Sequence, residues 1–389
     1  MFDRSCRIHF NSCCRIDMKQ FVKNVIKNYI YYSGNRSYDF LYKKIIASNP
    51  ELGKIAEGEK EWLMKWRRYD SKLSPLSYRI FSRYIGEDMN ILPLELCVNV
   101  IEPVLTPSGF REFYSDKNVF DKYIPREYFP KVVLRNIRGV FYDENYNLIW
   151  RENVDKYLSD IKLEQLVIKP SLMCSGVGVQ ILSKDSDGFR NKDGDVLSLR
   201  FLTDKYGSDY LVQECFQQSE VTSFFNTSSV NTIRIATYRD QQGVSHVLNA
   251  ILRIGAKGTN VDNAHAGGMF CGISKDGKIG SYVCDWLGRK KNIFNEIDFS
   301  KGNYWIPNFD KVREFAVNVA KYIIHHDLIA FDIVLDENNI PKLLEINVGG
   351  FSGWLFQFTS GTVFEEYTDE VMEYCMGKSR KLKVQIIYG

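Results

Sequence analysis

Two apolar segments near the C-terminus carry three side chains with oxygen donors. Asp332 lies in IAFDIVLD, and Glu345 and Asn347 lie in PKLLEIN. A turn at residues 337–339 joins the segments, so we expect antiparallel strands with Asp332 and Glu345 near each other. Glu345 and Asn347 are two residues apart and therefore point to the same face. Oxygen-only ligands of this kind are typical of Mg²⁺, which completes its shell with water and nucleotide phosphates.

A pair of strands whose polar side chains simply face solvent would give the same pattern. The neighbouring strand residues are apolar, and polar groups on an otherwise buried face are costly unless something compensates them. Gly349, Gly350 and Gly353 follow directly, and glycine lets the backbone approach a ligand closely. The glycines therefore favour a binding site.

A lysine ends the apolar start of the run QLVIKPSLMCSGVGVQIL. Lys169 is followed by a turn with Ser175, Gly176 and Gly178, and then by a second strand. Backbone N–H groups in such a turn can surround phosphate oxygens, and the lysine adds a positive charge. The order of a Walker A loop is absent, and no helix follows at once as in a dinucleotide fingerprint. A plain hairpin with a glycine turn is the alternative.

Two arginines interrupt apolar strands further along. Arg234 lies in NTIRIATY and Arg253 in AILRIG, each pointing away from its isoleucine neighbours. They either face solvent or bind phosphate or carboxylate in fork geometry. The loop at 258–268, GTNVDNAHAGG, is small, polar and bounded by glycine, as binding loops often are. It contains His265, a candidate base, although a single loop histidine is more often incidental.

The elements that must position these residues follow from the hydrophobic periodicity. The first 90 residues predict helices at 19–32, 37–48 and 58–69, and a long amphipathic helix is predicted at 309–326. Short strands are predicted at 91–105 and 131–150, and strands dominate from residue 163. This is an α+β pattern with antiparallel hairpins, and not the regular alternation of a dinucleotide-binding sheet.

The composition is that of an ordinary globular protein. Apolar residues make up 44% of the chain, enough for a sizeable core, and the net charge of +3 does not require a nucleic-acid partner. The nine cysteines form no CxxC pair, which argues against a zinc ribbon. No apolar run approaches the roughly 18–20 residues of a membrane span. We therefore expect a cytoplasmic protein without an integral membrane segment.

Taken in order, these segments resemble the ATP-grasp superfamily, above all its sugar-transfer-associated branch, found among polysaccharide biosynthesis enzymes. The resemblance covers roughly residues 105–370 and rests on SDKNVFDKYI, LVIKPSLMCSGVGVQIL, YLVQECF, NTIRIATY, ILRIG with GTNVDNAHAGG, and FDIVLD with LLEINVGG. It implies an ATP-grasp fold, with two α+β subdomains gripping ATP. The first 90 residues fall outside the resemblance. We therefore expect a helical N-terminal region (1–90), a pre-grasp α/β region (91–160), an ATP-grasp domain (161–375) and a tail (376–389).

The resemblance also implies roles for individual residues, with ATP and Mg²⁺ as cofactors. Lys117 matches a lysine that meets the nucleotide phosphates, with Lys122 as its rival. The remaining matches to nucleotide-binding positions are Lys169 on the first grasp strand, Ser175, Gly176 and Gly178 in the phosphate loop, Gln213, Glu214, Cys215 and Phe216 beside adenine, and Glu220 at the ribose. The matches to catalytic positions are Arg234, Arg253 and Asn263, and those to magnesium ligands are Asp332, Glu345 and Asn347. Three ligands leave open whether one or two ions bind.

The chemistry implied by the resemblance is formation of an amide from a carboxylate and an amine through an acyl phosphate. The branch favours an amino acid and a carboxylated sugar, a uronic acid, as substrates in surface or capsular polysaccharide biosynthesis. The alternatives are a phosphotransferase, a ligase for amino acids or peptides without a sugar, and a binding protein with a relict nucleotide site. We expect Phe351, Trp354, Phe356 and Gln357 to border the acceptor side, because they follow the metal-binding strand.

Overall fold

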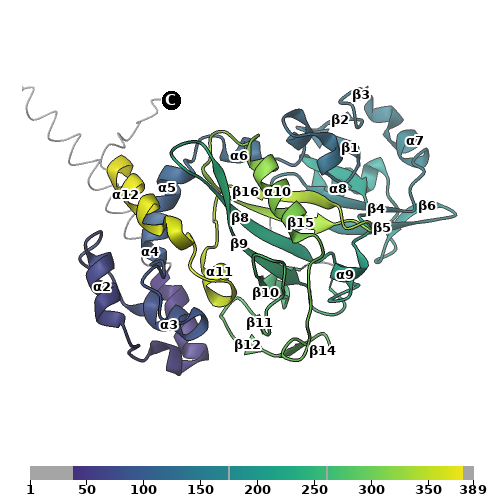
Figure 1. Ribbon diagram of the computed structural model, residues 1–389. Coiled ribbons are helices and arrows are strands. Elements are labelled where there is room, and N and C mark those ends of the chain that lie inside the picture. The colour runs from purple at the N-terminus through teal and green to yellow at the C-terminus, as the bar shows by residue number, and fades with distance from the viewer. Residues whose placement is uncertain (1–37, 174–175, 260–261, 380–389) are drawn as a thin grey trace, which may run out of the picture.

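Two antiparallel sheets of seven strands each form the frame of the protein (Figure 1). The computed structural model describes residues 38–173, 176–259 and 262–379. The first sheet, in the order β3-β2-β1-β7-β4-β5-β6, comprises β1 Val132–Ile137, β2 Val140–Tyr142, β3 Leu148–Ile149, β4 Gln165–Pro170, β5 Gln180–Asp185, β6 Gly188–Asn191 and β7 Tyr210–Glu214. The second, in the order β12-β11-β10-β9-β8-β15-β16, comprises β8 Thr232–Arg239, β9 Ser245–Ile254, β10 Met269–Ile273, β11 Val283–Cys284, β12 Lys290–Lys291, β15 Leu328–Leu335 and β16 Pro341–Asn347. A small third sheet pairs β13 Ile293–Phe294 with β14 Ile297–Asp298.

Strands lie where the sequence predicts them from residue 131 onward. The turn predicted between Tyr142 and Leu148 is present and is closed by Asp143, whose carboxylate accepts the backbone N–H groups of Asn145 and Asn147, both at 2.8 Å. Every residue of β15 is buried, which explains its unbroken apolar character apart from Asp332. Such a strand is covered on both faces.

Helices make up the N-terminal region. Residues 38–48 are helical and are followed by α2 Glu59–Arg67 and α3 Leu76–Ile85, in agreement with two of the predicted helices. The helix predicted at 19–32 lies outside the described residues. In α2, Trp62 and Trp66 lie one turn apart on the buried face, and their indole N–H groups donate to the carbonyls of Ile91 and Met89, both at 2.9 Å.

The strand predicted at 91–105 is wrong. This segment forms α4 Leu94–Leu96, a π-helical turn at Cys97–Ile101 and α5 Glu102–Leu105. A continuous apolar run does not by itself distinguish a buried strand from a buried helix. Here Pro93 and Pro103 stand at helix starts, where the missing N–H costs nothing, and the apolar side chains are buried against α12 Thr368–Ser379.

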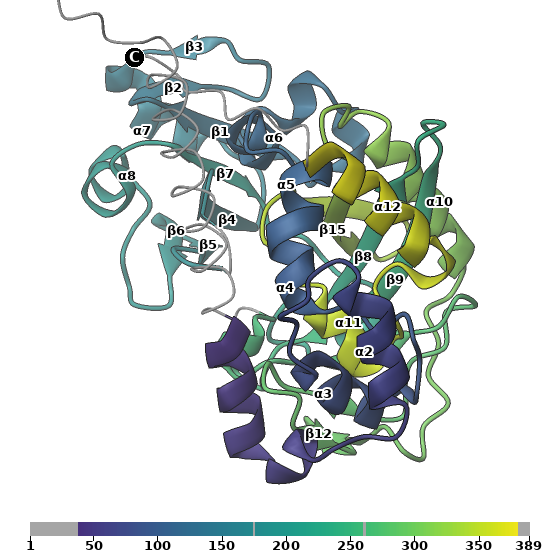
Figure 2. The same cartoon turned by 90° about the vertical axis from the view of Figure 1, so that its left-hand side faces the viewer.

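The N-terminal helices pack against C-terminal helices and not against the first sheet (Figure 2). They share one core with α11 Trp354–Thr359, α12 and one face of the second sheet. Phe81 and Tyr84 on α3 contact Phe358 on α11, with ring centroids 5.1 and 4.7 Å apart. The described part of this region, residues 38–90, is therefore an integral part of the core on one face of the second sheet.

Helix α10 Phe309–Ala320 covers the opposite face of the second sheet, with the predicted residues Val312, Phe315, Ala316 and Val319 inward. It ends earlier than the predicted residue 326. Arg239 explains the end, because its guanidinium donates to the carbonyls of Ala320 at 2.7 Å and Ile323 at 2.9 Å. A basic side chain at these carbonyls satisfies the end of a helix.

Short helical segments connect the remaining elements. They are η1 Pro50–Gly53, α6 Arg111–Ser115, η3 Phe120–Lys122, η4 Arg126–Tyr128, η5 Arg151–Asn153, α7 Val154–Ser159, α8 Leu199–Tyr206, α9 Glu220–Ser223, η6 Ala264–Ala266 and η7 Glu365–Tyr367. Strands β1–β3 precede residue 160 and share a sheet with β4–β7, so this sheet spans the predicted limit between the 91–160 and 161–375 regions.

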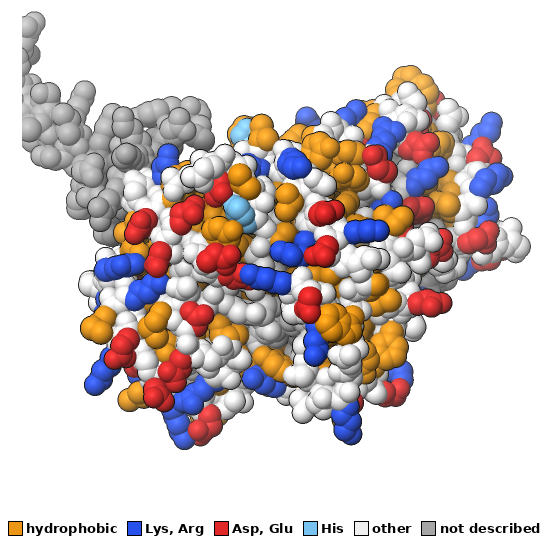
Figure 3. Space-filling model, in the orientation of Figure 1, with side chains coloured by type: hydrophobic (Ala, Val, Ile, Leu, Met, Phe, Trp, Pro, Cys, Tyr) orange, Lys and Arg blue, Asp and Glu red, His pale blue; other side chains and the backbone are white. Residues whose placement is uncertain are grey.

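The surface carries charges of both signs, interspersed over the face in Figure 3. In the part of the chain that the structure describes, the helices lack the combination of length and apolar character that a bilayer span requires.

A buried histidine lies between α10 and β15. His326 is fully buried, and neither ring nitrogen has a hydrogen-bond partner among the described residues. Its ring packs edge-on against Tyr114, with 5.3 Å between the ring centroids. Burial, reinforced by the positive charge of Arg111, lowers the pKa of His326 from 6.5 to about 4. The folded protein therefore keeps this side chain neutral.

Lowering the pH from 7.5 to 5 is expected to remove roughly 2 kcal/mol of stability through His326. As the pH falls, the unfolded chain binds this proton first, so stability is present above pH 6.5 and is lost towards pH 4. Urea unfolding at both pH values would measure the loss, with His326→Leu as the control. Glu95 contributes a pH dependence of stability with the opposite sign, because burial raises its pKa to about 7. This contribution is the same in both proteins and cancels in the difference between them. Equal pH dependence in both proteins would contradict the prediction.

Candidate functional site

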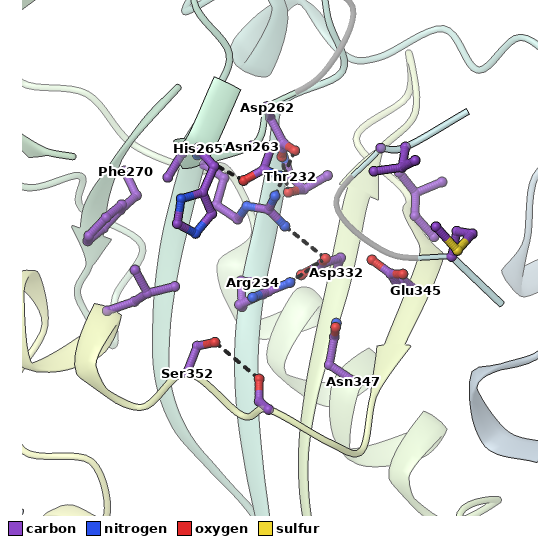
Figure 4. A pocket seen from close by; sticks show the side chains of 18 of the residues that line it. Thr232, Arg234, Asp262, Asn263, His265, Phe270, Asp332, Glu345, Asn347 and Ser352 are labelled. Carbon is purple, nitrogen blue, oxygen red and sulfur yellow. Dashed lines mark hydrogen bonds and ion pairs between the residues drawn. The ribbon is translucent and has the colours of Figure 1, made fainter. Parts of the chain in front are cut away.

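A row of charged side chains crosses three neighbouring strands of the second sheet (Figure 4). Asp332 on β15 pairs with Arg234 on β8 on one side and with Glu345 on β16 on the other. A bulge follows Asp332 in the ladder with β16 but leaves this pairing intact. The predicted juxtaposition of Asp332 and Glu345 on one face is therefore confirmed.

Asp332 is held by both predicted arginines. Arg234 donates from Nε to Oδ1 at 2.7 Å and from Nη2 to Oδ2 at 2.8 Å, and Arg253 donates to Oδ2 at 2.9 Å. Asp332 is only 3% exposed. Burial alone would raise the pKa of its carboxyl, but the two guanidinium groups outweigh burial and lower it to about 2. The arginines therefore line the cavity as an ion-paired cluster and do not face bulk solvent.

A second carboxylate, Asp262, extends this cluster and was not singled out from the sequence. Its Oδ1 lies 3.0 Å from Nη2 of Arg253, and its Oδ2 accepts hydrogen bonds from the backbone and hydroxyl groups of Thr232. Burial raises the pKa of Asp262 despite the neighbouring Arg253. Its place in the polar loop GTNVDNAHAGG is the signal that could have identified it. Asp262 therefore binds Nη2 of Arg253, while Asp332 binds Nη1.

Two lysines approach the row, Lys169 from β4 of the first sheet and Lys117 from the segment between α6 and η3. Lys117 is 8% exposed, and its ammonium lies 3.1 Å from Glu345 Oε1 and donates to the carbonyl of Met173 at 2.9 Å. Lys169, at the end of β4, lines the same cavity, and burial together with the charge of Lys117 lowers its pKa to about 7. Lys122, the rival of Lys117, is exposed and lies over the ring of Tyr146 at 3.5 Å. The structure thus places Lys117, and not Lys122, at the cavity.

These side chains line a cavity of about 440 Å³ between the two sheets. Asn263 and His265 also line it, and Asn263 accepts the backbone N–H of His265 at 3.0 Å. Gly176 and Lys169 are shared with an adjoining cavity of about 500 Å³. Three residues of the predicted adenine linker line the adjoining cavity: Gln213, Cys215 and Phe216.

The other predicted nucleotide residues lie less directly at these cavities. Glu214 lines a neighbouring cavity of about 390 Å³ with Lys117, and its carboxylate accepts the backbone N–H of Lys131 at 2.7 Å. Gly178 has a φ of +76°, and a Cβ there would meet Pro170 at 2.9 Å, so glycine is required by packing. Glu220 is exposed at the start of α9 and lines none of these cavities. Ser175 lies outside the described residues.

The prediction for the acceptor side is partly wrong. Phe351, Phe356 and Gln357 are buried in the core shared with the N-terminal helices. Gln357 accepts the backbone N–H of Leu92 at 2.6 Å and donates to its carbonyl at 3.2 Å. Trp354 alone of the four lines the cavity, and Trp286, which the sequence did not single out, lines it too.

Three neighbouring groups offer oxygen to a metal ion. They are the carboxylates of Asp332 and Glu345 and the side-chain amide of Asn347 on the same face of β16. The side-chain nitrogen of Asn347 is buried and has no hydrogen-bond partner in the described structure. The Asn347 amide also lies near enough to Asp332 to help lower the pKa of that carboxyl. Among the described residues no three Asp, Glu, His or Cys side chains gather as a metal cluster. The oxygen set fits Mg²⁺ completed by water and phosphate oxygens.

Two antiparallel sheets enclose a shared cavity, to which the first contributes Lys169 and the second contributes arginines and acids. This arrangement, with the family match, defines an ATP-grasp fold. The chain belongs to the sugar-transfer associated ATP-grasp family, whose model matches residues 115–373. No curated protein matches the chain in sequence.

Several solved structures are similar to the chain. The D-cycloserine synthetase DcsG has 12% identity and a TM-score of 0.40 over 72% of this chain and 74% of its own. The D-alanine–D-alanine ligase from Coxiella burnetii has 11% identity and a TM-score of 0.37 over 69% of this chain and 59% of its own. The corresponding ligase from Bacillus anthracis has 13% identity and a TM-score of 0.35 over 80% and 78%. The chain thus matches less than two thirds of the Coxiella burnetii enzyme.

Proposed function

We propose that this protein is an ATP- and magnesium-dependent ligase that releases ADP and joins a carboxylate to an amine through an acyl phosphate. The observation that carries the proposal is the charged cluster of Arg234, Arg253, Asp332 and Glu345, which lines one cavity together with Lys117 and Lys169. The two arginines, the two lysines and the oxygen ligands for a metal are what a triphosphate and a transferring phosphoryl group require.

The nucleotide is proposed to lie across the two joined cavities. Val167, Ile181 and Leu344 give the adjoining cavity apolar walls, and the segment at 213–216 offers backbone hydrogen-bonding groups for a flat base. Lys169 and Gly176, which border both cavities, are then placed at the phosphates. Bound Mg²⁺, held by Asp332, Glu345 and Asn347, would neutralise phosphate charge.

The residues of the cavity are proposed to act by position and charge. Arg234 and Arg253 orient the acceptor carboxylate and stabilise the charge on the transferring phosphoryl group, whose bond to ADP breaks as the bond to the carboxylate oxygen forms. In the second step the amine nitrogen bonds to the acyl carbon, and the carbon–oxygen bond to phosphate breaks. The amine proton leaves with the phosphate, so no covalent enzyme nucleophile is needed.

The substrates are proposed to be an amino acid and a carboxylated sugar, a uronic acid, in cytoplasmic steps of surface or capsular polysaccharide biosynthesis. The family description, sugar-transfer associated, supports a sugar substrate. The uncharged, aromatic part of the cavity lining, with Phe270, Trp286 and Trp354, is compatible with one.

ADP release from ATP and Mg²⁺ tests the proposal, with the twenty amino acids screened against glucuronic and galacturonic acid. We expect ADP release only when both an amine and a carboxylate are present. Release of AMP, or full activity without any amine, would overturn it. In the second case, phosphorus NMR of the product would identify a stable phosphate ester and hence a phosphotransferase.

A further inference from the structure

The 440 Å³ cavity has a side that faces away from the proposed nucleotide. Figure 4 shows His265 and Phe270 on one side of the Arg234–Asp332 pair and Glu345 on the other. His265, Trp286 and Trp354 line this cavity but not the adjoining one with the predicted adenine linker. A second substrate can therefore reach the arginines from the aromatic side while a nucleotide lies on the other side.

Two indole rings stand on this side on adjacent elements. Trp286 follows β11 by two residues, and its ring lies 4.9 Å from that of His265, at 46°. Trp354 begins α11, which packs against β11, and its ring meets Phe358 edge-on at 6.0 Å. Both indoles are only partly buried and line the cavity, and the Lys44 ammonium lies 5.3 Å from the centroid of the Trp286 ring.

The polar side chains on this side offer hydrogen bonds. His265 and Ser352 line it, and the Ser352 hydroxyl donates to the carbonyl of Gly350 at 3.1 Å. The charged side chains that line the cavity in the described structure belong to the ion-paired cluster and the two lysines. The ammonium of a free amino acid would find no carboxylate among the lining residues on the aromatic side, where the neighbouring charge is the Lys44 ammonium, 5.3 Å from the Trp286 ring centroid. A neutral polyol ring would find indole surface and hydrogen-bonding groups there.

We propose that Trp286 and Trp354, with His265 and Ser352, form the subsite that binds the sugar ring of the carboxylate substrate. The ring stacks on indole surface, and its carboxylate points to Arg234 and Arg253. The inference rests on the proposed function, because it names the place of one of the two substrates of that reaction.

Steady-state kinetics of Trp286→Ala and Trp354→Ala test the subsite. We expect KM for the uronic acid to rise about tenfold or more, as the loss of a buried aromatic contact requires, while KM for ATP and for the amine changes less than twofold. Trp150→Ala is the matched control, because Trp150 is 63% exposed and lies beside the first sheet. Trp286→Phe should restore part of the affinity. A rise in KM for ATP or the amine instead, or no rise in KM for the uronic acid, would overturn the subsite.

Binding without turnover separates this inference from the proposed function. Saturation-transfer NMR with glucuronic acid, galacturonic acid and glucose requires no ATP. We expect signals from the sugar ring protons with the wild type and with Trp150→Ala, and loss of these signals with the two cavity variants, Trp286→Ala and Trp354→Ala. This result would support the subsite even if no ADP were formed. If wild type forms ADP but gives the same signals as the cavity variants, or if no sugar binds, the subsite is wrong. Circular dichroism establishes that each variant is folded.

Discussion

Replacing Glu345 with Gln is expected to lower the turnover number about a thousandfold or more, with little change in the free energy of unfolding. Glu345 lies on the edge strand β16, its side chain is 20% exposed, and its ion pair in the described structure is with Lys117. Lys117 keeps the carbonyls of Met173 and Ser171 as acceptors when the carboxylate is lost. The folded state therefore loses little, whereas the proposed metal site loses one of its two carboxylates.

The rate of ADP release and urea unfolding, measured on the same samples, would give both quantities. Glu337→Gln is the matched control, because Glu337 is an exposed residue of the turn between β15 and β16. It makes the same chemical change on the same hairpin. A Glu345→Gln enzyme with a turnover number within threefold of the wild type would contradict the metal assignment.

Replacing Asp332 with Asn is expected to reduce stability by about 3–5 kcal/mol as well as to abolish turnover. Asp332 is the shared counterion of Arg234 and Arg253, whose side chains are 12% and 13% exposed. Removal of one partner of a buried ion pair leaves a charge without compensation. Because the carboxyl has a pKa of about 2, this stabilisation is present above about pH 4 and is lost only as the pH falls from 4 towards 2.

A second substitution in the Asp332→Asn protein sharpens the test. Arg253 retains Asp262 at 3.0 Å, but Arg234 retains no carboxylate of its own in the described structure. Arg234→Met should therefore recover more stability in the Asp332→Asn background than Arg253→Met does. Chemical unfolding of both double variants gives the comparison. Equal recovery would contradict the compensation of Arg253 by Asp262, and an Asp332→Asn protein as stable as the wild type would show that the ion pairs do not stabilise the fold.

The pairing of Asp332 with Glu345 and the face on which each arginine lies are predictable from local pattern, whereas the contact between Asp332 and Arg234, 98 residues apart, is not. A tight turn fixes antiparallel pairing, and a period of two fixes the face, so the sequence by itself places Asp332 and Glu345 together. The arginines follow from their apolar neighbours, since Ile233 and Ile235 had to be buried and Arg234 had to point the other way. Each of these inferences spans one strand or one hairpin.

The rest of the site depends on contacts between distant segments. Nothing local distinguishes Phe356, which is buried under the N-terminal helices, from Trp354, which lines the cavity two residues earlier. Trp286 joins the cavity because β11 packs beside α11, a contact with no signature in the sequence around it. The error at 91–105 has the same origin, because packing against α12 decides between helix and strand for an apolar run.

The hydrogen bond between Leu92 and Gln357 joins positions 265 residues apart, so it cannot form until Gln357 has been synthesised. At about 5–20 residues per second, α3 leaves the ribosome roughly 10–50 seconds before α11 does. Until then Phe81 and Tyr84 lack their partner Phe358 and are available to chaperones or to other nascent chains. Helix α3 is therefore made early but is among the last elements to reach its final contacts.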